Sequence, residues 1–335
     1  MGRAALLLTL LVSSSAVGSV DPSKLGPVPP GFEWVRGVRG VILCRAGHGV
    51  LLEQAGFRVD AHFSGESLPD ADESGKEPLA KLRLEVDGSS GPLDCLVRRF
   101  SHGGLARAFT GRRFKDPKRP FEELRLSEAL RRASIPTPRV LAARAVRHGL
   151  GGYELALVTE RLDSKVDIGI LIGRVRRGEA PQKDLRRAVV QSARLIAAMH
   201  EAGFRHSDLQ PANLLVPAGG LGKARRGLES SGAAVLDLDR SEFVPDDLDP
   251  QPLAESTRWK NLGRLWRHVH RREQKYGAVF SSCDLALFLQ AYGVPRDQLP
   301  RVAAQVQSAA ASKALLHRAG WMLDGLLGRG QDARA

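Results

Sequence analysis

The sequence is poor in the residues that mark several common protein classes. It has only three cysteines in 335 residues, Cys44, Cys95 and Cys283. Their wide spacing fits neither a disulfide framework nor a metal site, so we expect reduced thiols. Aromatic residues make up 5% of the chain. They are not interleaved with basic residues, which disfavours a nucleic-acid partner.

The sequence also has fewer acidic than basic residues. It contains 50 Lys and Arg but 37 Asp and Glu, which gives a formal net charge of +13. Such an excess predicts attraction to an anionic partner, for example a nucleotide, a phospholipid surface, lipopolysaccharide or a nucleic acid. A GC-rich genome would produce the same abundance of arginine. The composition therefore leaves both readings open.

The most informative feature of the chain is the polar segment 206–216, with the sequence HSDLQPANLLV. It places Asp208 five residues before Asn213, and a further acid, Asp237, follows an apolar run that predicts a buried strand. An aspartate can accept a proton from a hydroxyl, an asparagine at this spacing can bind a metal, and a second aspartate can hold Mg²⁺ against the phosphates of ATP. Each residue alone is most simply a turn cap. Together they predict a kinase-type site with Asp208 as base and Asn213 and Asp237 as metal ligands.

The N terminus conflicts with an ATP-dependent site. Arg3 precedes a mostly apolar run over residues 4–12 and small residues at 13–16, a pattern typical of a signal peptide. The run is too short to predict a transmembrane span with assurance, and no later segment is long and apolar enough. Because an exported enzyme would find no ATP, we favour a membrane-contact segment or a start codon placed too far upstream over secretion.

Hydrophobic periodicity divides the rest of the chain into a strand-rich part and a helix-rich part. Strands are expected within 32–63 and over 81–86, 93–100, 139–145 and 153–162, with one helix from Pro120 to about Ala133. Helices are expected over 182–201, 259–276, 282–292 and 299–327. His200, near the end of the first of these, is interpreted as a structural residue at a position that tolerates a cation.

These elements predict an α+β, bilobal, protein-kinase-like fold with a small β-rich N-lobe and a larger α-helical C-lobe. The expected division is an apolar segment and proline-rich linker over 1–31, the N-lobe over 32–162 with an antiparallel sheet and one helix, the C-lobe over 163–327, and a disordered tail over 328–335. The Gly- and Arg-rich stretch 217–232 interrupts the C-lobe, and the sequence assigns it no role.

Several segments resemble the bacterial lipopolysaccharide core kinase family, which includes Kdo kinases and heptose kinases. The resemblance spans about 96–292. It rests on LVRRFSHGGL at 96–105, RPFEELRL at 119–126, IPTP at 135–138, LDLDR at 236–240 and WKNLGRL at 259–265. It implies a protein-kinase-like fold and ATP-dependent phosphorylation of a sugar hydroxyl of the lipopolysaccharide inner core, at the cytoplasmic face of the inner membrane.

The resemblance also implies roles for individual residues. Arg98 stands where protein kinases place the phosphate-binding lysine, and Glu123 corresponds to the helix glutamate that orients this cation. For Arg98 and Glu123, a surface ion pair is the alternative. No G-x-G-x-x-G precedes Arg98. Gly103 and Gly104 follow it instead, as either a phosphate contact or a turn.

Two departures from protein kinases bear on the acceptor. Ser207 replaces the arginine that positions activation segments, and Gln210 replaces a lysine common in Ser/Thr kinases. The first argues against regulation by loop phosphorylation, and the second disfavours a protein acceptor. The sequence hypothesis is thus a Mg-ATP-dependent Kdo or heptose kinase that acts on Kdo-lipid A at the inner membrane, with no nucleic-acid partner. A kinase for another small molecule or a protein, and a non-catalytic binder of anionic glycolipid, are the alternatives.

Overall fold

The computed structural model describes residues 19–61, 63, 65, 79–86, 91–101, 113–148, 152–162, 165–217, 232–244 and 251–311. Several sequence predictions lie outside these residues: the signal-like segment, Gly103 and Gly104, nearly all of the 217–232 stretch, and the C-terminal tail. None of the described helices combines the length and the apolar character needed to cross a bilayer.

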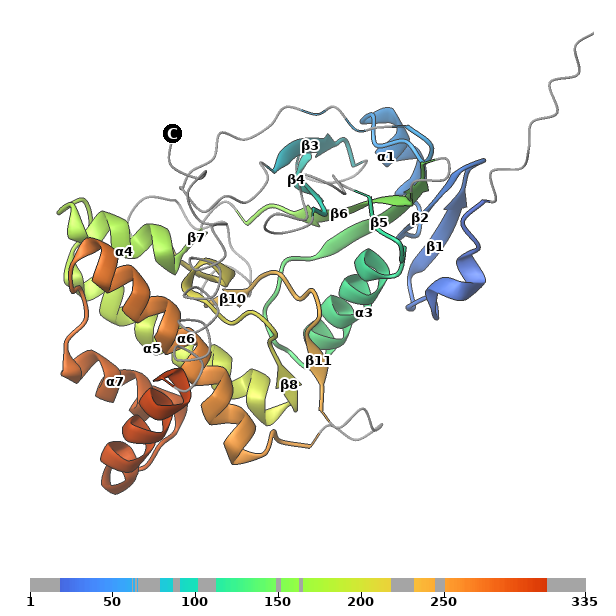
Figure 1. Cartoon of the computed structure of the whole chain (residues 1–335). Coiled ribbons are helices and arrows are strands. Elements are labelled where there is room, and N and C mark those ends of the chain that lie inside the picture. Colours follow the sequence, from blue (N-terminus) through green and yellow to red (C-terminus); the bar gives the residue numbers. More distant parts are fainter. Residues whose placement is uncertain are drawn as a thin grey trace, which may run out of the picture.

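The N-lobe is a six-stranded antiparallel sheet with the strand order β1-β2-β5-β6-β4-β3 (Figure 1). The expected alternation is visible in β3, where Ala80, Leu82 and Leu84 are buried while the residues between them are exposed. The strands are β1 (Phe32–Arg36), β2 (Gly40–Arg45), β3 (Ala80–Leu84), β4 (Leu93–Arg99), β5 (Val140–Arg147) and β6 (Tyr153–Glu160).

Helix α3 (Arg119–Arg132) covers one face of this sheet, on β5 and β6. It buries Phe121, Leu124 and Leu130, as the apolar spacing predicts. The expectation of a single N-lobe helix was wrong, because α1 (Gly49–Gln54) is a second one. The apolar run at 50–52 fits a strand equally well, but in the helix Leu52 is buried, Leu51 packs against the core partly buried, and Val50 is 66% exposed. A 3₁₀ turn, η1 (Pro22–Leu25), lies in the segment expected to be a linker.

The C-lobe is mainly helical. Its helices are α4 (Ile168–Arg176), α5 (Gln182–Glu201), α6 (Glu255–Tyr276) and α7 (Ser282–Tyr292), followed by a short 3₁₀ turn η3 (Arg296–Gln298) and a helix over 299–311. Its short strands and turn are β7 (Lys165–Asp167), β8 (Phe204–Arg205), η2 (Pro211–Asn213), β9 (Leu214–Pro217), β10 (Ala234–Val235) and β11 (Glu242–Phe243).

Local sequence explains where these helices begin. The Asp167 carboxylate accepts a hydrogen bond from the Ile170 N–H at 2.8 Å and caps α4. Ser281 and Asp284 form a reciprocal capping box at the start of α7. In α5, the apolar positions Leu185, Val189, Ala193, Ile196 and Met199 are buried.

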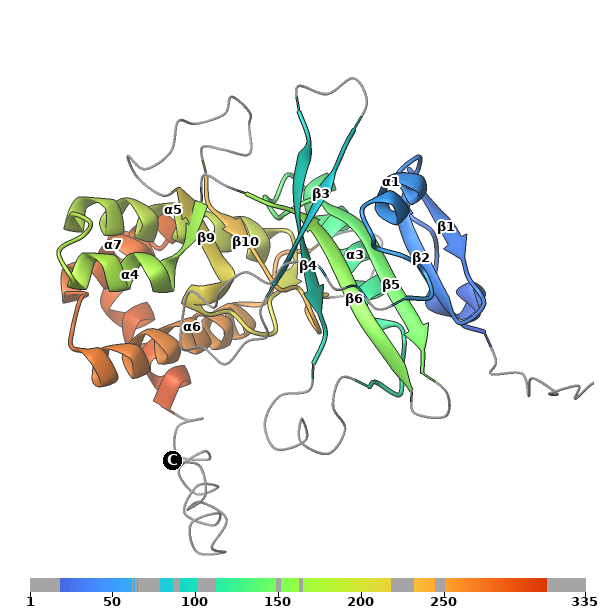
Figure 2. The ribbon, with the colours of Figure 1, turned by 90° about the horizontal axis from the view of Figure 1, so that it is seen from above.

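The two lobes lie side by side (Figure 2), and the α+β, bilobal fold class is confirmed. Two antiparallel ladders, β10-β9-β7 and β11-β8, lie next to the N-lobe sheet and frame the segment 206–213. All three cysteines are free thiols, as expected. Burial raises the pKa of both Cys44 and Cys95 to about 12, so both remain protonated.

Candidate active site at the junction of the lobes

The imidazole of His206 joins the two acidic segments of the site. The Asp208 N–H donates a hydrogen bond to Nδ1 of His206 at 3.1 Å, and Nε2 lies 2.8 Å from the Leu236 carbonyl oxygen. Because Nδ1 accepts, Nε2 carries the proton and donates it. Burial lowers the pKa of His206, which keeps the ring neutral. The Leu236 N–H donates in turn to the Asn213 carbonyl at 2.9 Å.

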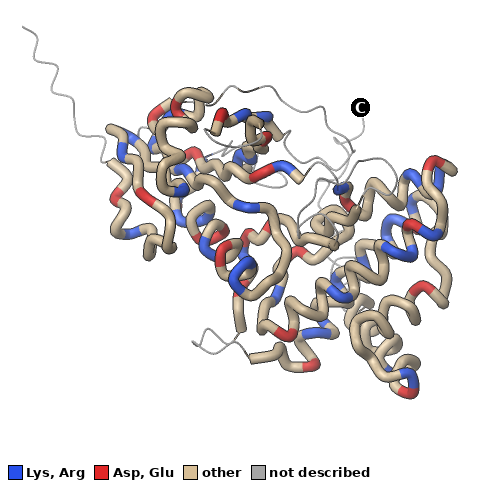
Figure 3. The backbone as a smooth tube through the Cα atoms, turned by 180° about the vertical axis from the view of Figure 1, so that it is seen from behind, with Lys and Arg blue, Asp and Glu red and all other residues tan. Residues whose placement is uncertain are grey.

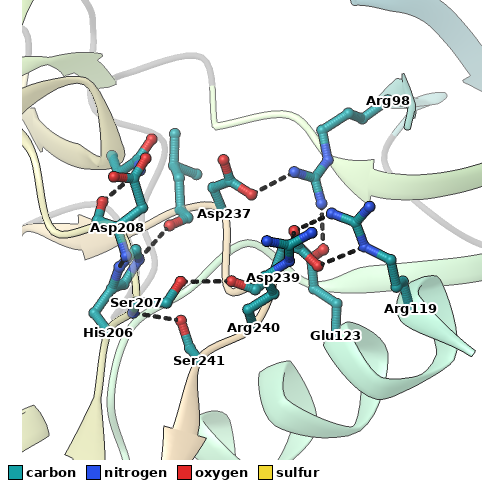
Figure 4. Close-up of polar contacts among 12 residues, drawn as sticks. Arg98, Arg119, Glu123, His206, Ser207, Asp208, Asp237, Asp239, Arg240 and Ser241 are labelled. Atoms are coloured by element: carbon teal, nitrogen blue, oxygen red, sulfur yellow. Dashed lines mark hydrogen bonds and ion pairs between the residues drawn. The ribbon is translucent and has the colours of Figure 1, made fainter. Parts of the chain in front are cut away.

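Asp237 has a left-handed backbone with φ +56°. Aspartate adopts this conformation more readily than most residues with a Cβ. The chain therefore turns sharply after β10, and the Asp237 carboxylate points towards Arg98 (Figure 4).

Asn213 is buried and braces the loop from its far end. Its Nδ2 donates to the Asp208 carbonyl oxygen at 2.8 Å, with a longer contact of 3.5 Å to Asp208 Oδ2. The five-residue spacing thus closes the turn on itself. It also places the amide beside the carboxylate.

Arg98, at the end of β4, connects the N-lobe to Asp237. One Nη donates to Asp237 Oδ1 at 2.5 Å, and the other donates to Glu123 of α3 (Figure 4). Glu123 is only 4% exposed, so this is no surface ion pair. Burial alone would lower the pKa of Arg98, but Glu123 and Asp237 raise it. Burial, and then Asp237 and Asp239, raise the pKa of Glu123 to about 7, against the opposing effect of Arg98.

A second arginine bridges the lobes in a way that the sequence reasoning missed. Arg119, the first residue of α3, donates through Nε to Asp239 Oδ1 at 3.1 Å and through Nη2 to the other oxygen. Its guanidinium also lies over the rings of Phe100 and Phe114, at 5.4 and 4.9 Å from their centroids. Arg119 and Asp239 both lie in segments that resemble the family. Neither segment by itself indicates that these two side chains pair.

Asp208 itself is paired with an arginine that was also missed. Arg264 of α6 approaches Asp208 Oδ1 with Nη2 at 3.0 Å and Nε at 3.3 Å. Gln210 donates to Oδ2 at 2.6 Å. Both oxygens of the predicted base therefore accept hydrogen bonds in this structure.

Behind the loop lies a buried hydrogen-bond chain. Tyr292 donates to Nδ1 of His200 at 2.7 Å, Nε2 of His200 lies 3.0 Å from Asn261 Oδ1, and Asn261 Nδ2 donates to the His206 carbonyl at 2.7 Å. Burial lowers the pKa of His200 to about 4. His200 is structural, as interpreted from the sequence, and its ring is neutral.

The structure thus brings together Asp208, Asn213, Asp237, Arg98 and Glu123, while Gly103 and Gly104 lie outside the described residues. In the described part of the chain, no three His, Cys, Asp or Glu side chains gather as a metal cage. Mg²⁺ is usually held by one or two side chains plus phosphate oxygens rather than by such a cage. The oxygen donors of Asn213 and Asp237 fit that mode of binding.

Two lobes joined by an arginine, with an aspartate, an asparagine and a second aspartate at the junction, form the arrangement that a kinase-type site requires. A family model matches the part of the sequence that contains it. It covers residues 97–292, more than half of the chain, and by this match the protein belongs to the lipopolysaccharide kinase (Kdo/WaaP) family.

Individual relatives are named as sugar kinases. The chain is 33% identical over 184 residues to a 3-deoxy-D-manno-octulosonic acid kinase of Xanthomonas campestris pv. campestris, covering 52% of this chain and 61% of the relative. It is 34% identical over 205 residues to the kinase of that name from Stenotrophomonas maltophilia, covering 59% and 70%. The chain thus spans about three fifths of the length of the Xanthomonas relative.

Among solved structures, the chain is similar to WaaP in complex with acyl carrier protein. The sequence identity is 20% and the TM-score 0.47, over 75% of this chain and 88% of that one.

Proposed function

We propose that this protein transfers the γ-phosphoryl group of ATP to a sugar hydroxyl of the lipopolysaccharide inner core, on Kdo or heptose. The observation that carries the proposal is that the neutral His206 ring hydrogen-bonds to both Asp208 and Leu236, which brings the segment of Asp208 to the segment of Asp237. Membership of the family supports the sugar acceptor, as do the names of the relatives.

In this proposal, Asp208 accepts the proton of the sugar hydroxyl while the oxygen of that hydroxyl attacks the γ-phosphorus. The bond from that phosphorus to the β,γ-bridging oxygen breaks, and ADP leaves. Arg98, held by Glu123, contacts the phosphates of ATP with the fork geometry of a guanidinium. Asn213 and Asp237 hold Mg²⁺, which supplies positive charge at the phosphates. Gly103 and Gly104 remain candidate phosphate contacts.

ATP use implies a cytoplasmic site of action, and the acceptor implies peripheral contact with the anionic inner membrane. The net charge of +13 supports such contact, because each basic side chain near an anionic surface adds roughly 1 kcal/mol of attraction.

The decisive experiment measures transfer of labelled phosphate from ATP to purified Kdo-lipid A, beside a generic protein substrate. Wild type should label the glycolipid alone, and Asp208→Asn should lower kcat by about 10³-fold because the base is lost. The Asn variant keeps the side-chain shape and the backbone hydrogen bonds of residue 208 to His206 and Asn213, so nucleotide binding should persist. Label on the protein substrate, or full activity in Asp208→Asn, would reject the proposal. Glycolipid binding without turnover would identify a non-catalytic binder.

A further inference from the structure

The carboxylate of Asp208 is already engaged before any acceptor reaches it. Arg264 covers Oδ1 and Gln210 covers Oδ2. The Arg264 and Asp208 side chains are 35% and 38% exposed, so their ion pair is open to exchange with solvent or ligand. An acceptor hydroxyl can reach Asp208 only if one of these partners gives way.

Arg264 is the first residue of a basic stripe on α6. Arg264, Arg267, His268 and Arg271 follow the i, i+3, i+4, i+7 spacing that puts side chains on one helix face. Leu262 and Leu265 of the same helix are buried in the core of the C-lobe, roughly opposite the stripe. Basic residues also recur along the other helices of this lobe (Figure 3).

The stripe carries positive charge that the described residues do not balance. Arg264 pairs with Asp208, but no described carboxylate pairs with Arg267 or Arg271, and the buried Nε of Arg267 has no hydrogen-bond partner among the described residues. Burial, Arg271 and Arg264 lower the pKa of Arg267.

Two other arginines of the lobe have carboxylate partners. Arg258 binds Glu201, and Arg205 binds Glu242. A run of unbalanced arginines that starts at the candidate base is a site for an anion, because guanidinium groups bind carboxylate and phosphate through paired hydrogen bonds.

We propose that the α6 stripe binds an anionic group of the acceptor, a sugar carboxylate or a glycolipid phosphate, and that Arg264 moves from Asp208 to this group when the acceptor hydroxyl takes its place at Asp208. This inference rests on the proposed function. The exchange preserves charge pairing, since one carboxylate–guanidinium contact is replaced by another. An uncharged acceptor leaves Arg264 on Asp208 and the base blocked.

The first test removes the stripe without touching Asp208. Arg267→Gln/Arg271→Gln should raise KM for Kdo-lipid A about tenfold, with kcat and KM for ATP within about twofold of wild type. Arg187→Gln/Arg194→Gln, on the exposed surface of α5, removes the same charge and should leave all three constants unchanged. Equal values of KM in the two double variants overturn the proposal.

Arg267 is half-buried, and its replacement could disturb the fold. Arg271 is exposed, so Arg271→Glu, compared with Arg194→Glu on α5, tests the stripe independently. The stripe variant should show the larger rise in KM and a weaker dependence of KM on salt than the control, because it has lost part of the attraction that salt screens. Identical salt profiles count against the stripe.

The source of the anion is distinguished by the acceptor. If the sugar carboxylate binds, its methyl ester should lose the advantage over a neutral sugar, whereas removal of the lipid phosphates should have little effect. If a lipid phosphate binds, removal of the phosphates should abolish the advantage over a neutral sugar, whereas the methyl ester should have little effect. Arg264→Gln should reduce the preference for the charged acceptor in either case. An unchanged preference in that variant, or acceptors that react equally well with and without their charges, rejects the inference.

A binding measurement separates this inference from the proposed function. Absence of transfer by wild type to any acceptor refutes the kinase assignment. Even in that case, calorimetric titration with Kdo-lipid A in the absence of nucleotide measures whether the stripe binds the acceptor. Weaker binding by Arg267→Gln/Arg271→Gln than by the α5 control supports it, and equal affinities overturn it.

Discussion

The arginine–carboxylate pairs that join the two lobes differ from the Arg264–Asp208 pair, whose members both belong to the C-lobe. At the junction, Arg98 contacts two carboxylates, Glu123 and Asp237. The Arg119–Asp239 pair is 22% and 19% exposed. Within the C-lobe, the Arg264–Asp208 pair has a single carboxylate and side chains 35% and 38% exposed. The junction pairs fix the position of one lobe relative to the other. In the more exposed C-lobe pair, Arg264 can exchange Asp208 for another anion.

The largest effect is expected from Asp237→Asn, which removes a charge at the junction but not the side-chain shape. Because Asp237 is proposed to hold Mg²⁺ beside Arg98, kcat should fall by about 10³-fold and the dependence of rate on Mg²⁺ should flatten. Initial rates over a Mg²⁺ titration measure both effects. Asp94→Asn, at an exposed residue paired with Arg83, is the control. An unchanged Mg²⁺ titration in Asp237→Asn would remove this residue from the metal site.

Glu123→Ala, compared with Glu128→Ala, tests whether the junction pair does more than stabilise the fold. Both glutamates lie on α3 and bind an arginine, Arg98 and Arg45 respectively. Each replacement leaves an arginine partly unpaired and should cost about 2 kcal/mol in urea unfolding. Only Glu123→Ala should raise KM for ATP, by about tenfold, because Arg98 loses its orientation. Equal KM values in both variants would make the Arg98–Glu123 pair purely structural.

The buried chain behind the loop predicts a pH effect on stability. Burial lowers the pKa of His200 from 6.5 to about 4. A depressed folded-state pKa gives stability that is present above pH 6.5 and lost as the pH falls towards 4. The free energy of unfolding should drop by about 2 kcal/mol from this residue between pH 7 and pH 5.

His200→Gln, which keeps a donor and an acceptor without a titratable ring, should remove that loss in urea unfolding at several pH values. His270→Gln, at an exposed site, should follow wild type. Parallel curves for His200→Gln and wild type would show that another group carries the pH dependence.

The smallest effect is expected from Arg119→Lys. Lysine keeps the charge but loses the two-pronged contact with Asp239 and the stacking on Phe100 and Phe114. We expect a loss of about 1 kcal/mol in thermal or urea unfolding and a modest fall in kcat. Arg83→Lys, in an exposed pair, should change neither. A loss of activity as large as that of Asp237→Asn would instead place Arg119 in contact with a reactant.

Part of this site could be predicted because its signal is local. Asp208 and Asn213 are five residues apart, and one turn brings them together. The apolar spacing of α3 and α5 determined which faces they bury. The helix α1 was missed, since three consecutive apolar residues satisfy two periodicities and only packing against the sheet selects one.

By itself, the sequence determined the fold class, the order of the two lobes and the chemical types of the candidate site residues, because short-range spacing and hydrophobic periodicity carry that information. Only the tertiary structure decided the partners: Arg264 for Asp208, Arg119 for Asp239, and a neutral His200 behind the loop. These pairs join residues that are 56, 120 and 92 positions apart. Contacts over such separations are set by how helices and strands pack, which no local pattern encodes.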